Sequence, residues 1–142
     1  MNVYLDTFAL VKLVVEEEGS EEAGAIWDAA DVVLTNRISY AEARAALAMA
    51  RRLGRLTPAG LSHAKQALEE RFRALLLVEV TDDLVRSAGD LAEVHGLRGY
   101  DAVHLASALT AESPNLVMGT WDQDLGKVAR RMGLDAPPFG RA

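Results

Sequence analysis

NVYLDTFALV, residues 2–11, decides the fold, because a short apolar run passes directly into an acid and then into a second apolar run. Residues 3–5 are β-branched, aromatic and aliphatic, which is typical of a strand buried on both faces. Asp6 follows at once, and helical spacing begins at Phe8. An acid between a strand and a helix lies at the carboxyl edge of a sheet, where open α/β sheets bind ligands. Asp6 is therefore predicted either to cap the helix or to bind a ligand.

The composition is that of an ordinary globular protein. The 142 residues are 50% hydrophobic and 25% charged, with no cysteine and a formal net charge of −6. This length predicts a single domain, residues 1–142, with one sizeable core. The absence of cysteine excludes disulfides and thiolate metal sites and favours a reducing cytoplasm, and no stretch is typical of a signal peptide or a membrane span. The acidic balance argues against broad electrostatic binding of nucleic acid but permits a cation site made of carboxylates.

Strand and helix patterns alternate along the chain, which predicts an α/β class with a mainly parallel sheet of four to five strands and helices on both faces. The first strand is expected in the middle of the sheet. Further strands are predicted at residues 32–35, 75–80 and 116–119, and helices at 8–18, 20–30, 39–53, 58–74, 82–95, 100–112 and 125–132. Ser20 and Thr57 are predicted helix caps. The tail from Asp135 through Gly140 is expected to be irregular, with at most a short edge strand.

Two further acids begin predicted helices. Glu42 stands three residues after Ser39, which matches a capping box, but the alanine-rich helix around it allows close packing that would turn the carboxylate toward the sheet edge. Asp101 shares a helix face with His104 on a mostly apolar helix, where a charge is costly unless it is paired or binds a metal. The alternative for Asp101 is a first-turn acid stabilised by the helix dipole. His104 is interpreted as a hydrogen-bonded core residue.

The last acidic pair follows the strand predicted at residues 116–119. Asp124 is nearer the start of the final helix, so it is predicted to cap that helix and leave Asp122 to point into the site. The alternative is that both acids serve only as turn and cap residues. Because carboxyl ends of neighbouring parallel strands meet at one edge, Asp6, Glu42, Asp101 and Asp122 can cluster there.

A cluster of four carboxylates needs compensation. Two carboxylates 4 Å apart repel by roughly 4 kcal/mol at an effective dielectric constant near 20, so the group would either hold protons or bind a cation. Oxygen ligands suit Mg²⁺ or Mn²⁺. A divalent ion can lower the pKa of a bound water and stabilise charge on a phosphodiester, which points to metal-assisted phosphodiester hydrolysis.

Four ordered motifs carry a family resemblance: VYLDT (residues 3–7), YAE (40–42), GYDAVHLA (99–106) and TWD (120–122). Together they resemble the motifs of PIN-domain ribonucleases, above all the VapC-type toxins of bacterial and archaeal toxin–antitoxin pairs. The resemblance spans almost the whole chain and implies a PIN-like three-layer α/β/α fold.

The resemblance also implies a site, a cofactor and partners. Asp6, Glu42, Asp101 and Asp122 would form the catalytic acidic site and hold Mg²⁺ or Mn²⁺. Thr7 and Thr120 would orient carboxylates or metal-bound waters, and Asp124 is a further candidate for such support. The implied substrate is RNA. The implied partners are a small antitoxin protein, which inserts a segment at the acidic groove, and a second copy in a homodimer or a higher assembly with antitoxin.

One departure from the family pattern keeps an alternative open. Phe8 stands where the family usually has a small polar residue such as serine or asparagine, which removes one possible hydrogen bond near Asp6. A PIN-like domain that binds a partner with weak or no catalysis is therefore the alternative function. A signalling receiver domain is disfavoured because the only lysines, Lys12, Lys65 and Lys127, lie in helical stretches, and a haloacid-dehalogenase-type phosphatase needs an aspartate where Phe8 stands.

Overall fold

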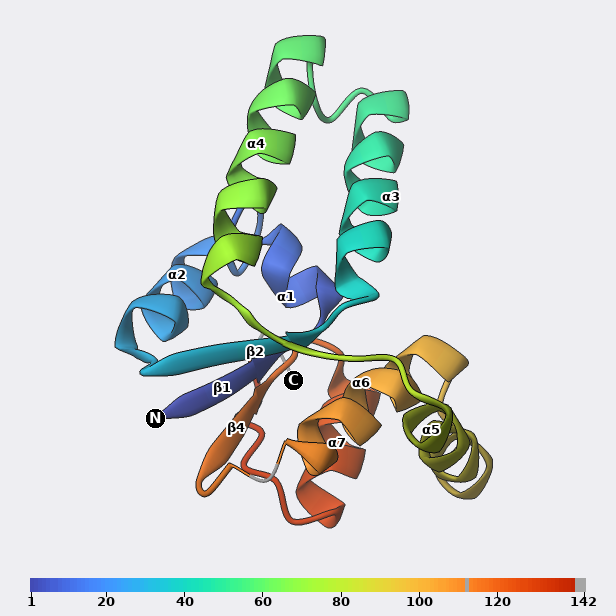
Figure 1. The fold of residues 1–142 in the computed structure, drawn as a ribbon. Helices are drawn as coiled ribbons and strands as arrows, with labels where there is room; N and C mark the ends of the chain where they lie inside the picture. The colour runs from blue at the N-terminus through green and yellow to red at the C-terminus, as the bar shows by residue number, and fades with distance from the viewer. Residues whose placement is uncertain (112, 140–142) are drawn as a thin grey trace.

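The computed structural model describes residues 1–111 and 113–139, and its centre is a four-stranded sheet (Figure 1). The strands are β1 (Asn2–Leu5), β2 (Val32–Asn36), β3 (Leu76–Val78) and β4 (Leu116–Gly119). Their order is β3-β2-β1-β4, and every pairing is parallel. The predicted parallel α/β sheet is thus confirmed, with β1 between two neighbours. Because β1 lies inside the sheet, Asp6, the residue that follows β1, lies in the middle of the carboxyl edge of the sheet.

The tail adds less to the sheet than a full strand. Val117 and Asp135 form an isolated parallel bridge, and the Met118 amide donates to the Asp135 carbonyl over 2.7 Å. The expected short edge strand is therefore a single bridge within the described residues. Two predicted features, the end of a helix at Glu112 and the tail's Gly140, lie outside the described residues.

Seven helices are described: α1 (Thr7–Val11), α2 (Ser20–Ala29), α3 (Ser39–Arg52), α4 (Pro58–Ala74), α5 (Asp82–His95), α6 (Gly99–Thr110) and α7 (Gln123–Arg131). Strand alternation sends β1 side chains to two cores. Tyr4 packs with residues of α6 and α7 on one face, while Val3 and Leu5 pack with residues of α1 and α2 on the other. The predicted three layers are therefore present, and α6 in turn packs on α5.

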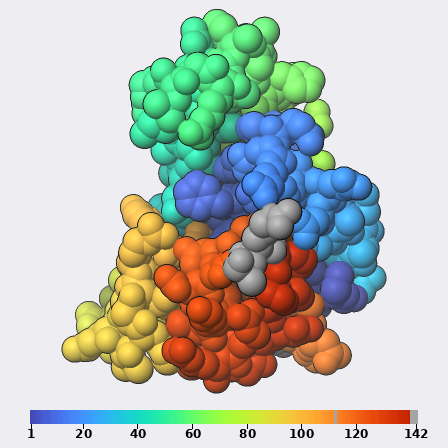
Figure 2. All heavy atoms as spheres, turned by 180° about the vertical axis from the view of Figure 1, so that it is seen from behind, coloured from blue at the N-terminus to red at the C-terminus, as the bar shows by residue number. Residues whose placement is uncertain are grey.

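Helices α3 and α4 form a hairpin that stands out from the sheet. Its inner surface is a separate apolar cluster in which Val11 of α1 meets Leu47 of α3 and Leu68 of α4. Figure 2, seen from behind, shows this hairpin as a lobe above the rest of the chain. The lobe begins at Ser39, so the first turn of α3 remains at the sheet edge and brings Glu42 to it.

Local turn chemistry accounts for two differences from the predicted helices. The first helix ends at Val11, seven residues earlier than predicted, because β-branched Val14 and Val15 disfavour helix and the Val14 amide bonds to the Val11 carbonyl in a tighter turn. Ser20 is not the N-cap of α2: that position is Gly19, with a φ of 90°. The Ser20 hydroxyl instead donates to the Val15 carbonyl.

The cap predicted at Thr57 is confirmed, since its side chain accepts from the Gly60 amide over 2.9 Å. Among the described helices, none is both long and apolar enough to cross a membrane.

Candidate functional site

Asp6 sits at the carboxyl end of β1 and is only 5% exposed. Its Oδ1 accepts from the Ala9 amide over 3.0 Å, so the predicted helix cap is real. Its Oδ2 accepts from the Thr120 hydroxyl at the end of β4. Burial raises the pKa of Asp6, the electrostatic interaction with His104 and these two hydrogen bonds oppose the rise, and the charge of Asp101 adds to it. The net effect is a raised pKa, so a cation bound nearby would favour the ionised form of Asp6.

Thr120 connects the first and last acids of the site. It donates to Asp6 and accepts from the Asp122 amide over 3.1 Å. A side chain that is bonded on both sides has one orientation, so Asp6 Oδ2 is held in place. The sequence prediction for Thr120 thus has a geometric basis, while its role in a reaction stays a prediction.

Glu42 does not take part in a capping box. The N-cap position of α3 is Ile38, with no side-chain cap, and the Ser39 hydroxyl pairs with the Thr35 hydroxyl over 2.7 Å. Glu42 Oε1 instead accepts from the Thr7 hydroxyl over 2.8 Å and from His104 Nε2 over 3.0 Å. The carboxylate therefore faces the sheet edge, as the alternative interpretation of its alanine-rich helix expected.

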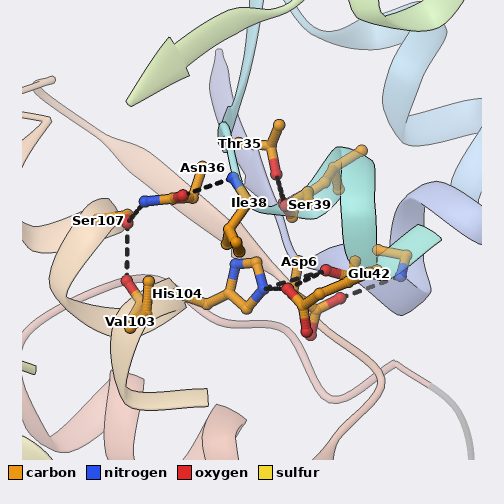
Figure 3. Close-up of polar contacts among 12 residues, drawn as sticks. Asp6, Thr35, Asn36, Ile38, Ser39, Glu42, Val103, His104 and Ser107 are labelled. Carbon is orange, nitrogen blue, oxygen red and sulfur yellow. Dashed lines mark hydrogen bonds and ion pairs between the residues drawn. The ribbon is translucent and has the colours of Figure 1, made fainter. Parts of the chain in front are cut away.

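His104 is a buried core residue, as predicted, and it also supports Glu42 (Figure 3). Its Nδ1 lies 2.7 Å from the Tyr4 hydroxyl, and its Nε2 faces Glu42. An ionised carboxylate only accepts, so Nε2 donates, and in the neutral ring Nδ1 accepts from Tyr4. Burial raises the pKa of Tyr4, which keeps its hydroxyl protonated as a donor. Burial also acts to raise the pKa of Glu42, but the hydrogen bonds from His104 and Thr7 outweigh it, and that pKa is lowered.

The structure corrects the prediction for the last acidic pair. Asp122, not Asp124, caps α7: its Oδ1 accepts from the Leu125 amide over 3.0 Å. The helix begins at Gln123, so the residue with extended backbone before it is Asp122 and the third residue inside is Leu125. Asp124 is an exposed acid in the first turn of α7. Asp122 is consequently not free, although its Oδ2 still faces the edge.

Arg98 is a charged member of the site that the sequence reasoning missed. It is the N-cap residue of α6, and its Nε donates to Asp101 Oδ2 over 3.0 Å. Its Nη2 donates to Asp122 Oδ2 over 3.3 Å. The spacing of three residues between Arg98 and Asp101 was a usable signal. The link to Asp122 was not, because it depends on how α6 and α7 pack.

The four predicted acids lie at one edge of the sheet but do not surround a common point. The charge of Asp101 raises the pKa of Asp6, and Arg98 forms ion pairs with both Asp101 and Asp122. Within residues 1–111 and 113–139, however, no three histidine, cysteine, aspartate or glutamate side chains meet closely enough to hold a metal ion. The donor chemistry fits Mg²⁺ or Mn²⁺, since every acid offers carboxylate oxygen.

Phe8 does not deprive Asp6 of support. Its side chain is 62% exposed and lines a groove of about 740 Å³ between α1 and α3, together with Thr7, Glu42 and Met49. Asp6 keeps its bonds to the Ala9 amide and Thr120. Asp6 therefore has two donors with Phe8 in place, while the effect of Phe8 on activity stays a prediction.

Comparison with known proteins gives concordant results. A family model described as PIN domain matches residues 3–131. Ribonuclease VapC45 of Mycobacterium tuberculosis (strain CDC 1551 / Oshkosh) is 45% identical over 136 residues, which cover 96% of this chain and 94% of that protein. Among solved structures, Mycobacterium tuberculosis VapC20, a Sarcin-Ricin loop cleaving toxin, matches with a TM-score of 0.70 and 20% identity over 89% of this chain and 94% of its own. A toxin–antitoxin complex from Klebsiella pneumoniae matches with a TM-score of 0.63 and 19% identity, covering 86% of this chain and 88% of its own.

Proposed function

The chain belongs to the PIN-domain family, with VapC ribonucleases among its relatives, and from this premise we propose that it is a ribonuclease and the toxin of a toxin–antitoxin pair. The observation that carries the proposal is Asp6, a buried carboxylate with a raised pKa at the carboxyl edge of a PIN-type sheet. Ionising a buried carboxylate is costly, and a cation at the sheet edge would lower that cost. We propose that the whole chain, residues 1–142, acts as one PIN-like domain.

The proposed reaction is hydrolysis of an RNA phosphodiester bond that depends on Mg²⁺ or Mn²⁺. Asp6, Glu42, Asp101 and Asp122 would hold the ion, which would supply an activated water and stabilise charge on the phosphate. The chain's own contribution is to fix the carboxylates. Thr120 and the Ala9 amide orient Asp6.

Glu42 receives equivalent support from the other side of the edge. Thr7 and His104 donate to it, and Tyr4 fixes the His104 ring. Both carboxylates are therefore oriented by protein groups before substrate arrives, which is what an efficient site requires. Asp124, exposed in the first turn of α7, would add negative charge near Arg98.

We also propose the partners that the family implies. A small antitoxin protein would bind the chain and block the acidic edge, and two copies of the chain would form a homodimer. Toxin–antitoxin complexes with the same fold support the first of these. A cytoplasmic location fits both the cysteine-free sequence and an RNA substrate.

The alternative is a PIN-like domain that binds a partner with weak or no catalysis, and one experiment separates the two. A fluorogenic oligoribonucleotide is incubated with purified protein and Mn²⁺ or Mg²⁺, and cleavage is compared with Asp6→Asn and Asp101→Asn. We expect cleavage by the wild type and a loss on the order of 100-fold or more in both variants, the scale of removing a charge-stabilising group from an active site.

The matched control is Asp90→Asn, which neutralises an exposed acid on α5. It should cleave like the wild type, and circular dichroism should show all variants folded. Equal cleavage by the wild type and both site variants would contradict the assignment of the residues. No cleavage by the folded wild type with either metal would favour the non-catalytic alternative.

A further inference from the structure

Arg98 joins two of the four acids from separate parts of the chain. Its Nε–Asp101 Oδ2 bond stays within the first turn of α6, while its Nη2–Asp122 Oδ2 bond reaches the start of α7. The guanidinium thus provides a positive charge between two carboxylates that would otherwise repel each other. In each contact the guanidinium donates to the Oδ2 atom of the aspartate.

The remaining oxygen of Asp122 is already engaged. Asp122 Oδ1 accepts from the Leu125 amide and caps α7. The oxygen of Asp122 that faces the edge is the one to which Arg98 donates, so a cation bound there would lie next to the guanidinium and be repelled by it. For this residue, a metal ion and the guanidinium therefore compete.

Arg98 is also the member of this group that can leave most easily. Its side chain is 77% exposed, whereas those of Asp101 and Asp122 are 21% and 33% exposed. An exposed ion pair contributes little to stability, because water replaces its interactions at low cost. The displaced guanidinium would remain next to the site on the N-terminus of α6.

We propose that Arg98 is a built-in counter-ion that a divalent cation displaces, and that the released guanidinium then binds a phosphate of the RNA. This rests on the proposed function, since it presumes a metal ion and an RNA substrate at the acidic edge. The planar guanidinium suits phosphate oxygens as well as carboxylates, so the same side chain serves both states. Arg98 would thereby offset part of the negative charge of the edge before the metal binds and contact the phosphate afterwards.

The first test is calorimetric titration of Mn²⁺ into wild type, Arg98→Gln and Arg98→Lys. Arg98→Gln keeps a polar side chain without charge, and we expect it to bind Mn²⁺ about threefold to fivefold tighter, the scale of losing one exposed ion pair. Arg98→Lys retains the charge and should bind close to the wild type. The matched control is Arg86→Gln. Arg86 is also 77% exposed and also pairs with an aspartate, Asp82, and its substitution by glutamine changes the net charge by the same amount.

The second test is the kinetics of oligoribonucleotide cleavage at saturating Mn²⁺. If Arg98→Gln loses a phosphate contact, its KM should rise about threefold, a larger change than the fall in kcat. The slope of the logarithm of the RNA-binding constant against the logarithm of the salt concentration should become shallower by about 1. An unchanged KM and salt slope would overturn the phosphate contact.

The calorimetric outcomes also separate this inference from the proposed function. If the wild type binds Mn²⁺ and Arg98→Gln binds it no tighter, the counter-ion role is wrong and the metal site stands. The same holds if Arg86→Gln tightens binding as much as Arg98→Gln, because the effect would then reflect net charge alone. If neither wild type nor Arg98→Gln binds Mn²⁺, the metal site is wrong and the role of Arg98 falls with it.

Discussion

The acidic edge has two halves that are held by different chemistry and that we name for their donors: the donors of the buried half include the buried side chains of His104 and Thr120, and the donor of the exposed half is the exposed Arg98. In the buried half, Asp6 and Glu42 accept hydrogen bonds from hydroxyl groups, a backbone amide and His104. In the exposed half, Asp101 and Asp122 are paired with one arginine that is itself 77% exposed.

The difference teaches how a protein can keep acids together without a metal ion. Hydroxyl and amide donors orient a carboxylate and leave its charge in place, so the buried half is fixed yet still attracts a cation. A guanidinium cancels charge but holds its partners loosely in water. The buried half therefore sets the position of the site, and the exposed half adjusts when a cation arrives.

The largest effect on stability is expected from breaking the buried half at His104. His104→Leu keeps the apolar volume but leaves the Tyr4 hydroxyl without its partner and removes a donor to Glu42. Each buried polar group that loses its partner costs about 1–3 kcal/mol, so urea unfolding should show a loss of about 2–3 kcal/mol.

Two controls determine whether hydrogen bonds cause that loss. His104→Gln retains a donor and should recover part of the stability, whereas His63→Leu, an exposed position on α4, should change it by less than about 0.5 kcal/mol. A His104→Gln variant as unstable as His104→Leu would show that ring packing, not hydrogen bonding, is what the site needs.

A smaller effect on stability, of opposite sign at Asp6 and Glu42, is expected from a change in pH. The pKa of Asp6 is raised by burial, so the folded chain binds this proton more tightly than the unfolded chain, and stability falls as pH rises above 3.8. The pKa of Glu42 is lowered, since its hydrogen bonds outweigh burial, so stability is gained above 4.5 and lost as pH falls below it.

In metal-free buffer at pH 7, Asp6→Asn should therefore be more stable than the wild type by on the order of 1 kcal/mol. Glu42→Gln should be less stable by about 0.5–1.5 kcal/mol. Thermal unfolding across pH 3–7 measures both, and each difference should shrink toward the acidic end. If Asp6→Asn and Glu42→Gln changed the free energy of unfolding in the same direction, the opposite pKa shifts of the two acids would not be what sets their stability.

Local patterns were sufficient to predict the parts of the site that lie near each other in sequence. The strand before Asp6 and the burial of His104 follow from apolar spacing, and both are confirmed. The choice between Asp122 and Asp124 as a cap was wrong because it depends on a helix start that sequence defines only to within a residue or two. The Arg98–Asp122 pair spans 24 residues and requires the packing of α6 against α7, which no local pattern encodes.

The central claim is that this edge binds a divalent cation, and the melting temperature of the free protein tests it most directly. A ligand that binds only the folded state at 100 times its Kd stabilises it by about 2.7 kcal/mol. Millimolar Mn²⁺ should therefore raise the Tm of the wild type by several degrees, and Asp6→Asn and Asp101→Asn should lose most of that rise. No rise in the wild type, or an equal rise in both variants, would contradict the claim.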